Sequence, residues 1–358
     1  MPIVPLVGHV ESCQRIASAR ARGSLPATLL LQGPRGVGKQ RLALWIAELL
    51  LCETPGVGPC GTCQGCRFHA NLRHPDLHWF FPRPRLKDTD PALEDVRADY
   101  AEAIAERSSE AGLYPAPSGS EGIYVAVVRA IVQLAAKTPA IAKRKVFIIG
   151  DAERMVPQEG SEQAANAFLK LLEEPPADTN IILTTSEPGA LLPTVRSRVV
   201  SMRVAPLSHE HMRVFLALPS VVERLSGDSS LPPNADDRIA LSGGAPGRLL
   251  AGAALRQANE NAQAMLAAIT GKSSARYEVA WAQASAKARG AFAEALDALT
   301  VLLHERARVS SRQGAEKSAF AATRAVDAVE VAKERVASNV SPQLVTANLL
   351  RELQELLA

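Results

Sequence analysis

The 358-residue sequence has few aromatic residues and no large excess of either charge. Phe, Trp and Tyr make up 4% of the chain and apolar residues 47%, a balance that excludes a disordered chain and is typical of a folded protein rich in helices. Forty basic residues oppose 37 acidic ones, which leaves a net charge of +3. The chain therefore lacks the strong positive field of a protein that binds nucleic acid unaided.

The sequence also lacks segments that would direct it to a membrane. Residues 1–10 contain no basic stretch followed by an apolar core, and no run reaches the roughly 18 uncharged apolar residues of a membrane span. We therefore expect a cytoplasmic protein of two or three domains, without membrane partners. Cytoplasmic thiols stay reduced, so the five cysteines are candidate metal ligands or isolated thiols before they are candidate disulfides.

One glycine-rich stretch has the pattern of a phosphate-binding loop. The apolar run 29–31 leads into GPRGVGK at residues 33–39, and an apolar helix follows. Glycines at such a junction let backbone N–H groups approach a phosphate chain, the helix dipole favours negative charge, and the lysine reaches the terminal phosphates. A glycine turn that happens to precede a lysine is the alternative. The candidate ATP- or ADP-binding residues here are Gly33, Gly36, Gly38 and Lys39.

The residues that would hold a magnesium ion are incomplete. The loop lysine is followed by Gln40, where a magnesium site requires a Ser or Thr hydroxyl. The buried strand predicted over 145–149 is followed by Gly150 and Asp151, where an aspartate for magnesium and a glutamate for water belong. If Asp151 takes the magnesium position, Ala152 stands at the glutamate position. One acidic group is missing in either register, so we expect a nucleotide-binding frame whose hydrolytic chemistry is relaxed or lost.

Four cysteines follow the loop's helix at a spacing typical of a metal site. Four thiolates on a tight, glycine-rich loop can close a tetrahedral zinc site. An iron–sulfur centre or four surface thiols are the alternatives, and structural zinc is favoured because no redox partner motif is visible. The predicted ligands are Cys52, Cys60, Cys63 and Cys66.

Residues 83–122 differ in character from the segments around them. They are charged and proline-rich at both ends, and an apolar stripe after Pro91 predicts a helix. We interpret them as an insertion on the surface, with a solvated linker as the simpler reading. A contact with DNA through Arg83, Arg85 and Lys87 is the alternative.

Several motifs taken together identify a family. The phosphate loop, the four-cysteine insertion, HPDL at 74–77, a helix ending LLEEPP at 171–176, and the pair Ser197-Arg198 resemble the delta-prime subunit family of the bacterial DNA polymerase III clamp loader. This is an AAA+ family, and the motifs are also similar to those of its gamma/tau motor paralogue. The resemblance extends over residues 7–202.

The resemblance implies a chain of three domains. Residues 1–205 are expected to form an α/β AAA+ P-loop domain, a parallel sheet with flanking helices, which carries the zinc module at 52–66 and the insertion at 83–122. A small helical lid is expected over 206–252. Residues 253–358 carry only amphipathic, alanine- and leucine-rich helical patterns, and the family assigns them to an all-α collar domain for oligomerisation.

The resemblance also implies partners and further site residues. The family builds a hetero-pentamer with gamma/tau motor subunits and delta, which sets the sliding clamp on primed DNA within the DNA-directed DNA polymerase holoenzyme. Arg198 is implied to act in trans on a neighbour's nucleotide, although a salt bridge at the interface is the alternative. Arg248 resembles the second sensor of AAA+ lids, with a solvent-facing arginine as the alternative. Thr185, at the polar end of a predicted strand, joins Gln40 and Asp151 in the candidate nucleotide site.

These residues separate two functions. One is an assembly subunit that supplies Arg198 to a neighbour and has no independent catalysis, and the other is an active motor ATPase, which the loop alone would support. A motor subunit is expected to carry Thr after the loop lysine and an Asp-Glu pair after the second strand, so Gln40 and Gly150 favour the assembly subunit. A zinc-dependent DNA-binding module is disfavoured by the small net charge, and no paired-carboxylate polymerase site is evident.

Overall fold

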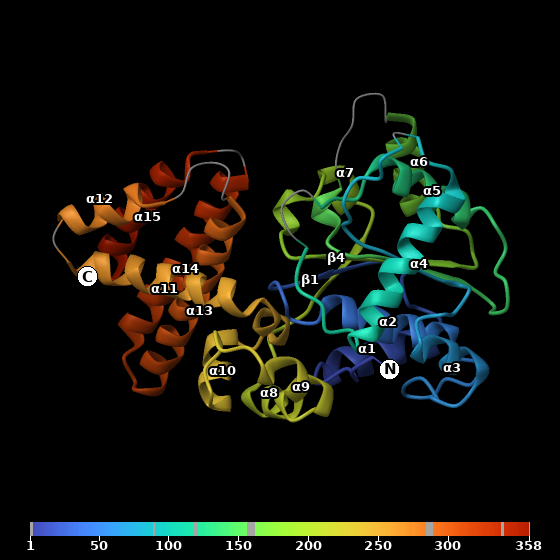
Figure 1. The fold of residues 1–358 in the computed structure, drawn as a ribbon, viewed down its shortest axis with the longest axis horizontal. Coiled ribbons are helices and arrows are strands. Elements are labelled where there is room, and N and C mark those ends of the chain that lie inside the picture. Colours follow the sequence, from blue (N-terminus) through green and yellow to red (C-terminus); the bar gives the residue numbers. More distant parts are fainter. Residues whose placement is uncertain are drawn as a thin grey trace. The chain divides into compact units, whose positions relative to one another are not determined.

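The structure is a computed structural model that describes residues 3–88, 90–117, 121–155, 162–271, 273–283, 289–337 and 340–357. It divides into two compact units, both drawn in Figure 1. The first unit comprises Met1–Gly227 and Asn234–Leu250, and the second comprises Asp228–Pro233 and Ala251–Ala358. Among the described residues, no helix combines the length and the apolar character needed to cross a membrane.

A parallel sheet of five strands, in the order β2-β3-β4-β1-β5, forms the centre of the first unit. The strands are β1 (Thr28–Gln32), β2 (Leu77–Phe80), β3 (Lys145–Ile149), β4 (Thr179–Thr185) and β5 (Val200–Arg203). Strands β1, β3 and β4 lie between neighbours and are almost fully buried, which explains their apolar runs. The expected α/β class with a parallel sheet is confirmed.

Helices connect the strands and cover the sheet (Figure 1). Those of the first unit are α1 (Val10–Ala21), α2 (Lys39–Leu51), α3 (Gln64–Ala70), α4 (Leu93–Ser109), α5 (Val125–Ala135), η1 (Ala152–Arg154), α6 (Glu162–Glu173), η2 (Pro188–Ala190), α7 (Pro193–Arg196), α8 (His209–Leu216), α9 (Pro219–Ser226) and α10 (Ala235–Ser242). Helix α2 packs against β1, β3 and β4 through an apolar face that includes Leu42, Ile46 and Leu49. This packing fixes the phosphate loop at the carboxyl edge of the sheet.

The sequence patterns do not predict helix α3 or strand β5 of the first unit. Helix α3 lies inside the cysteine module, where glycines and a short length hide the helical period. Strand β5 is an edge strand whose residues are mostly exposed, so it lacks the apolar run that marks β1, β3 and β4.

The expectation of a solvated linker over residues 83–122 is wrong for helix α4. This helix packs against β2, and its Tyr100 and Ala103 are buried in the core of the first unit. The Tyr100 hydroxyl donates a hydrogen bond of 2.6 Å to the carbonyl oxygen of Phe81. Residue 89 and residues 118–120 of this region lie outside the described residues.

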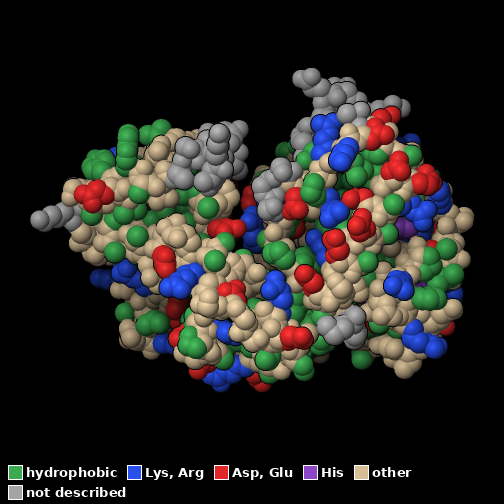
Figure 2. All heavy atoms as spheres, viewed as in Figure 1, with side chains coloured by type: hydrophobic (Ala, Val, Ile, Leu, Met, Phe, Trp, Pro, Cys, Tyr) green, Lys and Arg blue, Asp and Glu red, His purple; other side chains and the backbone are tan. Residues whose placement is uncertain are grey.

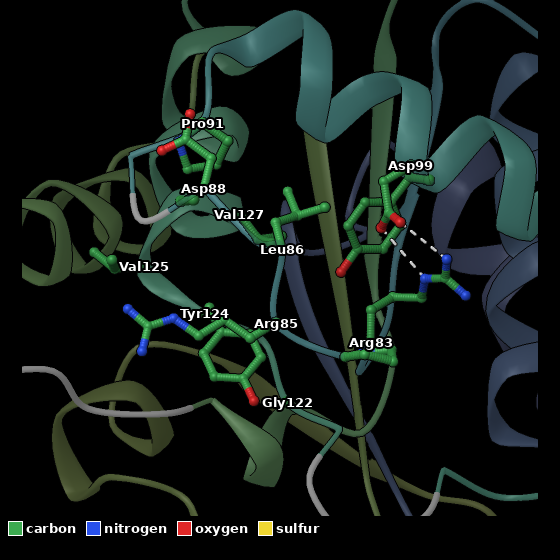
Figure 3. A pocket seen from close by; sticks show the side chains of 13 residues that line it. Arg83, Arg85, Leu86, Asp88, Pro91, Asp99, Gly122, Tyr124, Val125 and Val127 are labelled. Atoms are coloured by element: carbon green, nitrogen blue, oxygen red, sulfur yellow. Dashed lines mark hydrogen bonds and ion pairs between the residues drawn. The ribbon is translucent and has the colours of Figure 1, made fainter.

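The basic residues at the start of this region make contacts within the chain. Arg83 donates to both carboxylate oxygens of Asp99, at 3.2 and 2.9 Å, as Figure 3 shows. The guanidinium carbon of Arg85 lies 6.0 Å from the centre of the Tyr124 ring. A role of Arg83 in binding DNA would therefore require breaking a bidentate ion pair.

Among its described residues, the second unit consists of helices joined by turns and short loops and contains no strand. Its helices are α11 (Gly252–Thr270), α12 (Ser273–Trp281), α13 (Arg289–Arg312), α14 (Glu316–Ala337) and α15 (Pro342–Leu357), and η3 (Pro246–Ala251) leads into them. They share a core of small and aliphatic residues such as Ala262, Leu299 and Leu349. The helical C-terminal region is thus confirmed. Helices α8, α9 and α10 belong to the same compact unit as the sheet, and the division into three domains stays a prediction.

The surface carries charges of both signs. On the face drawn in Figure 2, basic and acidic side chains are interspersed and do not gather by sign. This distribution agrees with the small net charge of +3. The described residues drawn there form no broad basic stripe for the backbone of a nucleic acid.

Candidate functional site

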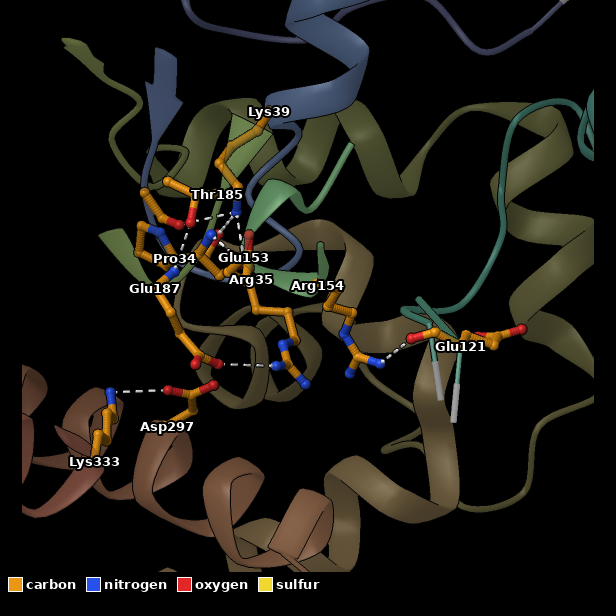
Figure 4. Close-up of polar contacts among 12 residues, drawn as sticks. Pro34, Arg35, Lys39, Glu121, Glu153, Arg154, Thr185, Glu187, Asp297 and Lys333 are labelled. Atoms are coloured by element: carbon orange, nitrogen blue, oxygen red, sulfur yellow. Dashed lines mark hydrogen bonds and ion pairs between the residues drawn. The ribbon is translucent and has the colours of Figure 1, made fainter. Parts of the chain in front are cut away.

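The loop between β1 and α2 has the backbone of a phosphate-binding turn. Gly36 and Gly38 have φ angles of 77° and 100°, in the left-handed region where other residues are strained. The buried ammonium group of Lys39 donates to the carbonyl oxygens of Gly33 and Pro34, both at 2.9 Å (Figure 4). The lysine thus lies inside the loop, at the start of α2.

The segment predicted to open the lid helix lies directly on this loop. The N–H of Gly247 donates to the carbonyl oxygen of Gly36 at 2.8 Å. A Cβ atom placed on Gly36 would lie 2.7 Å from the backbone nitrogen of Arg248, so only glycine fits there. Arg248 is half-buried beside the loop. Its contact with a nucleotide stays a prediction.

Gln40, the residue in the magnesium-binding position, is tied into a polar network. Its side-chain oxygen Oε1 accepts from Trp79 Nε1 at 3.1 Å and from the Tyr114 hydroxyl at 3.2 Å. Its Nε2 donates to Asp151 Oδ2 at 2.9 Å. The amide therefore joins α2 to β2, to the loop after β3 and to the residues that follow α4.

The residues after β3 are shaped to receive this amide. A Cβ atom on Gly150 would lie 2.6 Å from both Cδ and Oε1 of Gln40, closer than real side chains approach. Asp151 adopts a left-handed backbone with φ of 48°, and its N–H donates to Thr184 Oγ1 at 3.0 Å. Gly150 thus provides space for Gln40, and Asp151 provides the acceptor.

An arginine that the sequence prediction missed lies close to the network. The guanidinium carbon of Arg107, on α4, lies 3.2, 3.7 and 4.8 Å from the ring centres of Phe81, Tyr114 and Trp79. Burial lowers the pKa of Arg107, and the nearby Tyr114 and Asp151 oppose that change. No local motif marks Arg107 or Tyr114, because they reach the site only through the fold.

A second missed residue is Glu153, on η1. Its Oε1 accepts from the N–H of Ser186 at 2.9 Å, and the Ser186 hydroxyl accepts from Lys39 Nζ at 3.0 Å. Within the part of the chain that the structure describes, Glu153 Oε2 is buried without a hydrogen-bond partner. Burial, together with the charge of Asp151, raises the pKa of Glu153. The sequence offered a signal, an acidic residue two positions after Asp151.

Thr185 lies at the end of β4, next to the start of the loop. Its carbonyl oxygen accepts from the N–H of Gly33 at 3.3 Å, and its hydroxyl accepts from the N–H of Glu187 at 3.1 Å. The eight residues predicted to bind a nucleotide are thus gathered at one edge of the sheet. They are Gly33, Gly36, Gly38, Lys39, Gln40, Asp151, Thr185 and Arg248.

Arg198 lies apart from this group. Its carbonyl oxygen accepts from Thr28 Oγ1 at 3.0 Å, at the end of β1 that is remote from the phosphate loop. Its guanidinium donates to Glu173 Oε2 at 3.2 Å and to the Thr194 carbonyl oxygen at 3.0 Å. With a side chain 30% exposed, Arg198 stays accessible beyond the ion pair.

The four predicted zinc ligands are brought together at the other end of α2. The Sγ atoms of Cys52, Cys60, Cys63 and Cys66 all lie within 4.8 Å of one another. Two of the distances, Cys60 to Cys66 and Cys52 to Cys63, are 3.9 Å. Four sulfurs at 2.3 Å from a tetrahedral zinc ion would be about 3.8 Å apart. The cluster therefore fits a metal ion.

Backbone N–H groups support the sulfurs of this cluster. The Sγ atoms of Cys52, Cys60 and Cys63 accept from backbone nitrogens of Cys60, Cys63 and Cys66 at 3.3, 3.3 and 3.4 Å. Hydrogen bonds from the Thr62 N–H, the Thr54 side chain and the Cys63 N–H lower the pKa of Cys60 to about 5, whereas burial raises the pKa of Cys52 and of Cys66. A thiolate at neutral pH is the form that binds zinc.

The chain is similar to bacterial replication proteins. Residues 8–208 match the sequence family described as DNA polymerase III, delta subunit. DNA polymerase III subunit delta' of Pseudomonas aeruginosa is 34% identical over 172 residues, which cover 48% of this chain and 40% of the relative. Subunit delta' of Escherichia coli is 27% identical over 239 residues, covering 66% and 58%. DNA polymerase III subunit tau of Escherichia coli is 28% identical over 211 residues, covering 58% and 26%.

These matches span about 40 to 58% of the length of the delta' relatives named above. A gamma subunit-related protein of Thermotoga maritima has a solved structure that aligns over 98% of this chain and 100% of its own, at 18% identity and a TM-score of 0.38. That score is too low to carry an argument. The family match alone covers more than half of the residues, including both the phosphate loop and the four cysteines. The chain therefore belongs to the DNA polymerase III delta subunit family.

Proposed function

We propose that this chain is a delta-prime-type subunit of a bacterial clamp loader, which supports its neighbours and does not hydrolyse ATP itself. Its partners would be the gamma/tau motor subunits and delta in a hetero-pentamer that loads a sliding clamp onto primed DNA in the cytoplasm. The delta' relatives support this assignment over the part of their length that the chain matches. A structural zinc ion would occupy the four-cysteine cluster.

The observation that carries the proposal is the position of Arg198 relative to its own phosphate loop. Arg198 is hydrogen-bonded to Thr28 at the start of β1, whereas the loop follows Gln32 at the end of that strand. The four residue-to-residue steps from Thr28 to Gln32 span about 13 Å. An arginine at the edge remote from its own loop is suited to reach a nucleotide bound by a neighbour.

The chemistry expected of Arg198 is electrostatic. Its planar guanidinium can donate two hydrogen bonds to phosphate oxygens and stabilise the negative charge that develops as the γ-phosphoryl group is transferred. Arginine fingers supplied in trans accelerate hydrolysis by roughly 10³ to 10⁵. Glu173 holds the side chain in the isolated chain, and the exposure of this ion pair makes its exchange for a phosphate inexpensive.

The test is ATP hydrolysis by the assembled complex. Arg198→Ala is combined with the motor and delta subunits, and clamp- and DNA-stimulated hydrolysis is measured alongside complex formation. Arg196→Ala, an exposed arginine on α7, serves as the matched control. We expect both variants to assemble normally. Hydrolysis should be unchanged with the control, and with Arg198→Ala it should fall by the contribution of one active site. Unchanged hydrolysis with Arg198→Ala, or failed assembly alone, would refute the finger.

An active motor ATPase is the second candidate, and the buried Lys39 within an intact glycine loop favours it. Gln40 and Gly150 count against it, because neither offers a magnesium ligand of the usual type. The isolated chain is therefore expected to hydrolyse ATP negligibly in a steady-state assay. Turnover at a rate typical of motors, abolished by Lys39→Ala, would establish the motor instead.

A further inference from the structure

The phosphate loop belongs to a class that normally holds its nucleotide together with magnesium, yet the residues around Gln40 do not fit a metal ion. A magnesium site needs oxygen ligands in near-octahedral geometry with room for several waters. In place of a hydroxyl this chain has an amide, whose Nε2 lies 2.9 Å from Asp151 Oδ2. A hydrogen-bond donor thus stands against the carboxylate that a cation would need.

The amide of Gln40 is held in this position from two sides. Trp79 Nε1 and the Tyr114 hydroxyl both donate to its Oε1, at 3.1 and 3.2 Å. These two bonds fix which end of the amide faces Asp151, because the oxygen must face the two donors and the nitrogen the acceptor. Turning the amide over would place its Nε2 against the Trp79 N–H, which can only donate, and its Oε1 against the Asp151 carboxylate.

The space for the amide comes from Gly150. A Cβ atom there would lie 2.6 Å from Gln40 Cδ and 2.7 Å from Nε2. Position 150, one of the two positions at which a magnesium-ordering aspartate could stand, must therefore be glycine while Gln40 is present. The two departures that the sequence shows separately, at residues 40 and 150, form one complementary pair in the structure.

The residues after β2 close the other side of the amide. Tyr114 follows α4, and the Arg107 guanidinium of that helix lies 3.7 Å from the centre of the Tyr114 ring. Tyr114 is mostly buried, and burial raises its pKa. A neutral hydroxyl that donates to Gln40 is thus fixed by a stacked cation on its ring face.

We propose that the Gln40 amide occupies the place of the divalent cation, so that this loop can hold a phosphate group only without a metal. The proposal deepens the non-hydrolysing role given above, since a metal-free site cannot support motor chemistry. Its tests measure the stability and the metal response of this chain alone. A failure here would leave the role of Arg198 in an assembly untouched, and the reverse also holds.

The first test is a double-mutant cycle on the pair. Gly150→Ala, Gln40→Ala and the double variant are compared with the wild-type chain by thermal unfolding. We expect Gly150→Ala to lower the melting temperature by roughly 5 °C in the presence of Gln40, because the added methyl group overpacks the site. In the Gln40→Ala background the same change should lower it by less than half as much.

A matched control separates overpacking from the general effect of replacing glycine. Gly227→Ala adds a methyl group where no atom of the described residues lies within 4 Å and the backbone needs no positive φ. It should leave the melting temperature unchanged or slightly raised. Equal effects of Gly150→Ala with and without Gln40 would show that the amide does not fill the space, and would overturn the proposal.

The second test reads the metal response directly. The melting temperature of the wild-type chain is followed with MgCl₂ alone, with ADP alone and with both, in buffer freed of metals by a resin, since a soluble chelator would also strip the four-cysteine site. We expect the melting temperature to be the same with and without MgCl₂, both in the absence and in the presence of ADP. This expectation holds whether or not ADP itself stabilises the chain. Stabilisation that requires magnesium and disappears in Asp151→Asn would overturn the proposal.

Discussion

Helix α2 has a candidate ligand site at each end, and the side chains of the two sites are arranged in different ways. At its N-terminal end the glycine loop keeps the backbone of a phosphate site, while the side chain of Gln40 fills the cation position. At its C-terminal end four sulfurs within 4.8 Å of one another form a complete set of metal ligands. One loop has the shape without the ligands, and the other has both.

The comparison teaches that a loop's backbone and its donor atoms carry separate information. The glycines at 36 and 38 preserve a turn whose N–H groups can face an anion, but selecting a cation takes side-chain oxygens near position 40 and the end of β3. In the cysteine module the ligands themselves define the site, and the backbone N–H groups support them. A pattern match to a loop therefore predicts its shape better than its chemistry.

The largest effect on stability is expected from removing a zinc ligand at the C-terminal end of α2. We predict one zinc ion per chain, and Cys66→Ser should reduce it to near zero and lower the free energy of unfolding by more than about 3 kcal/mol. Metal analysis and denaturant unfolding measure the two quantities. Cys13→Ser, outside the cluster, is the control. Negligible zinc in the wild-type chain, with four alkylatable thiols, would show that neither end of α2 binds a metal ion, and would contradict this prediction.

A smaller effect is expected at Asp76, which follows the cysteine module without being a ligand. Its buried carboxylate accepts from the N–H groups of Ile141 and Ala142 at 2.9 and 2.7 Å, and from that of Ala140. Burial alone would raise its pKa, but these bonds lower it below the ordinary 3.8. Asp76→Asn should cost about 2 kcal/mol at pH 7, because an amide offers fewer acceptors and no charge.

The contribution of Asp76 to stability should depend on pH in a defined direction. A carboxyl group with a lowered pKa contributes stability that is present above its unfolded pKa and is lost as the pH falls through its folded pKa. The difference between wild type and Asp76→Asn should therefore shrink below about pH 4. Unfolding curves of Asp76→Asn and of the exposed control Asp88→Asn decide this. An unchanged free energy of unfolding in Asp76→Asn would contradict this prediction, and would mean that the cysteine module alone stabilises the region at the C-terminal end of α2.

At the phosphate-loop end a substitution is expected to stabilise the chain. The folded chain retains the proton of Glu153 to a higher pH than the unfolded chain, so Glu153 weakens the fold as the pH rises above about 4.5. Glu153→Gln should raise the free energy of unfolding by about 1 kcal/mol at pH 8 and by little at pH 4. The exposed Glu187→Gln is the control. A loss of stability at pH 8 would show that the charge of Glu153 is satisfied.

The smallest expected effect concerns the donors to Gln40. Tyr114→Phe removes the hydroxyl 3.2 Å from Oε1 but leaves the Trp79 donor and the stacked ring in place. The free energy of unfolding should fall by about 0.5–1 kcal/mol in denaturant titrations. A fall as large as that of Cys66→Ser would mean that the two ends of α2 depend equally on single groups.

Local sequence patterns predicted much of this architecture because its elements are buried. Strand β3 and residues 181–183 of β4 are apolar since both faces of these strands are covered, and the four cysteines are close in sequence as well as in space. The edge strand 200–203 gave no such signal, because most of its residues are exposed. Helix α4 was read as part of a linker, since the apolar stripe did not reveal that it covers β2.

The Gln40 network could not be read from the sequence for a different reason. Its members lie far apart in the chain, since Trp79 is 39 positions and Asp151 is 111 positions after Gln40. The sequence indicated that Gln40 and Gly150 are poor magnesium ligands, which is a statement about each residue by itself. That the two residues fit one another is a property of the packed sheet.

The close fit of Gln40 against Gly150 also restricts how the sequence can change one substitution at a time. A side chain introduced first at position 150 has no room while Gln40 is present. A smaller residue introduced first at position 40 leaves the Trp79 indole N–H and the Asp151 carboxylate without their bonds to Gln40. Both orders pass through a less stable chain. A metal-binding loop therefore requires substitutions at positions 40 and 150 together. Lys39 and the loop glycines meanwhile keep the sequence pattern of a phosphate-binding loop.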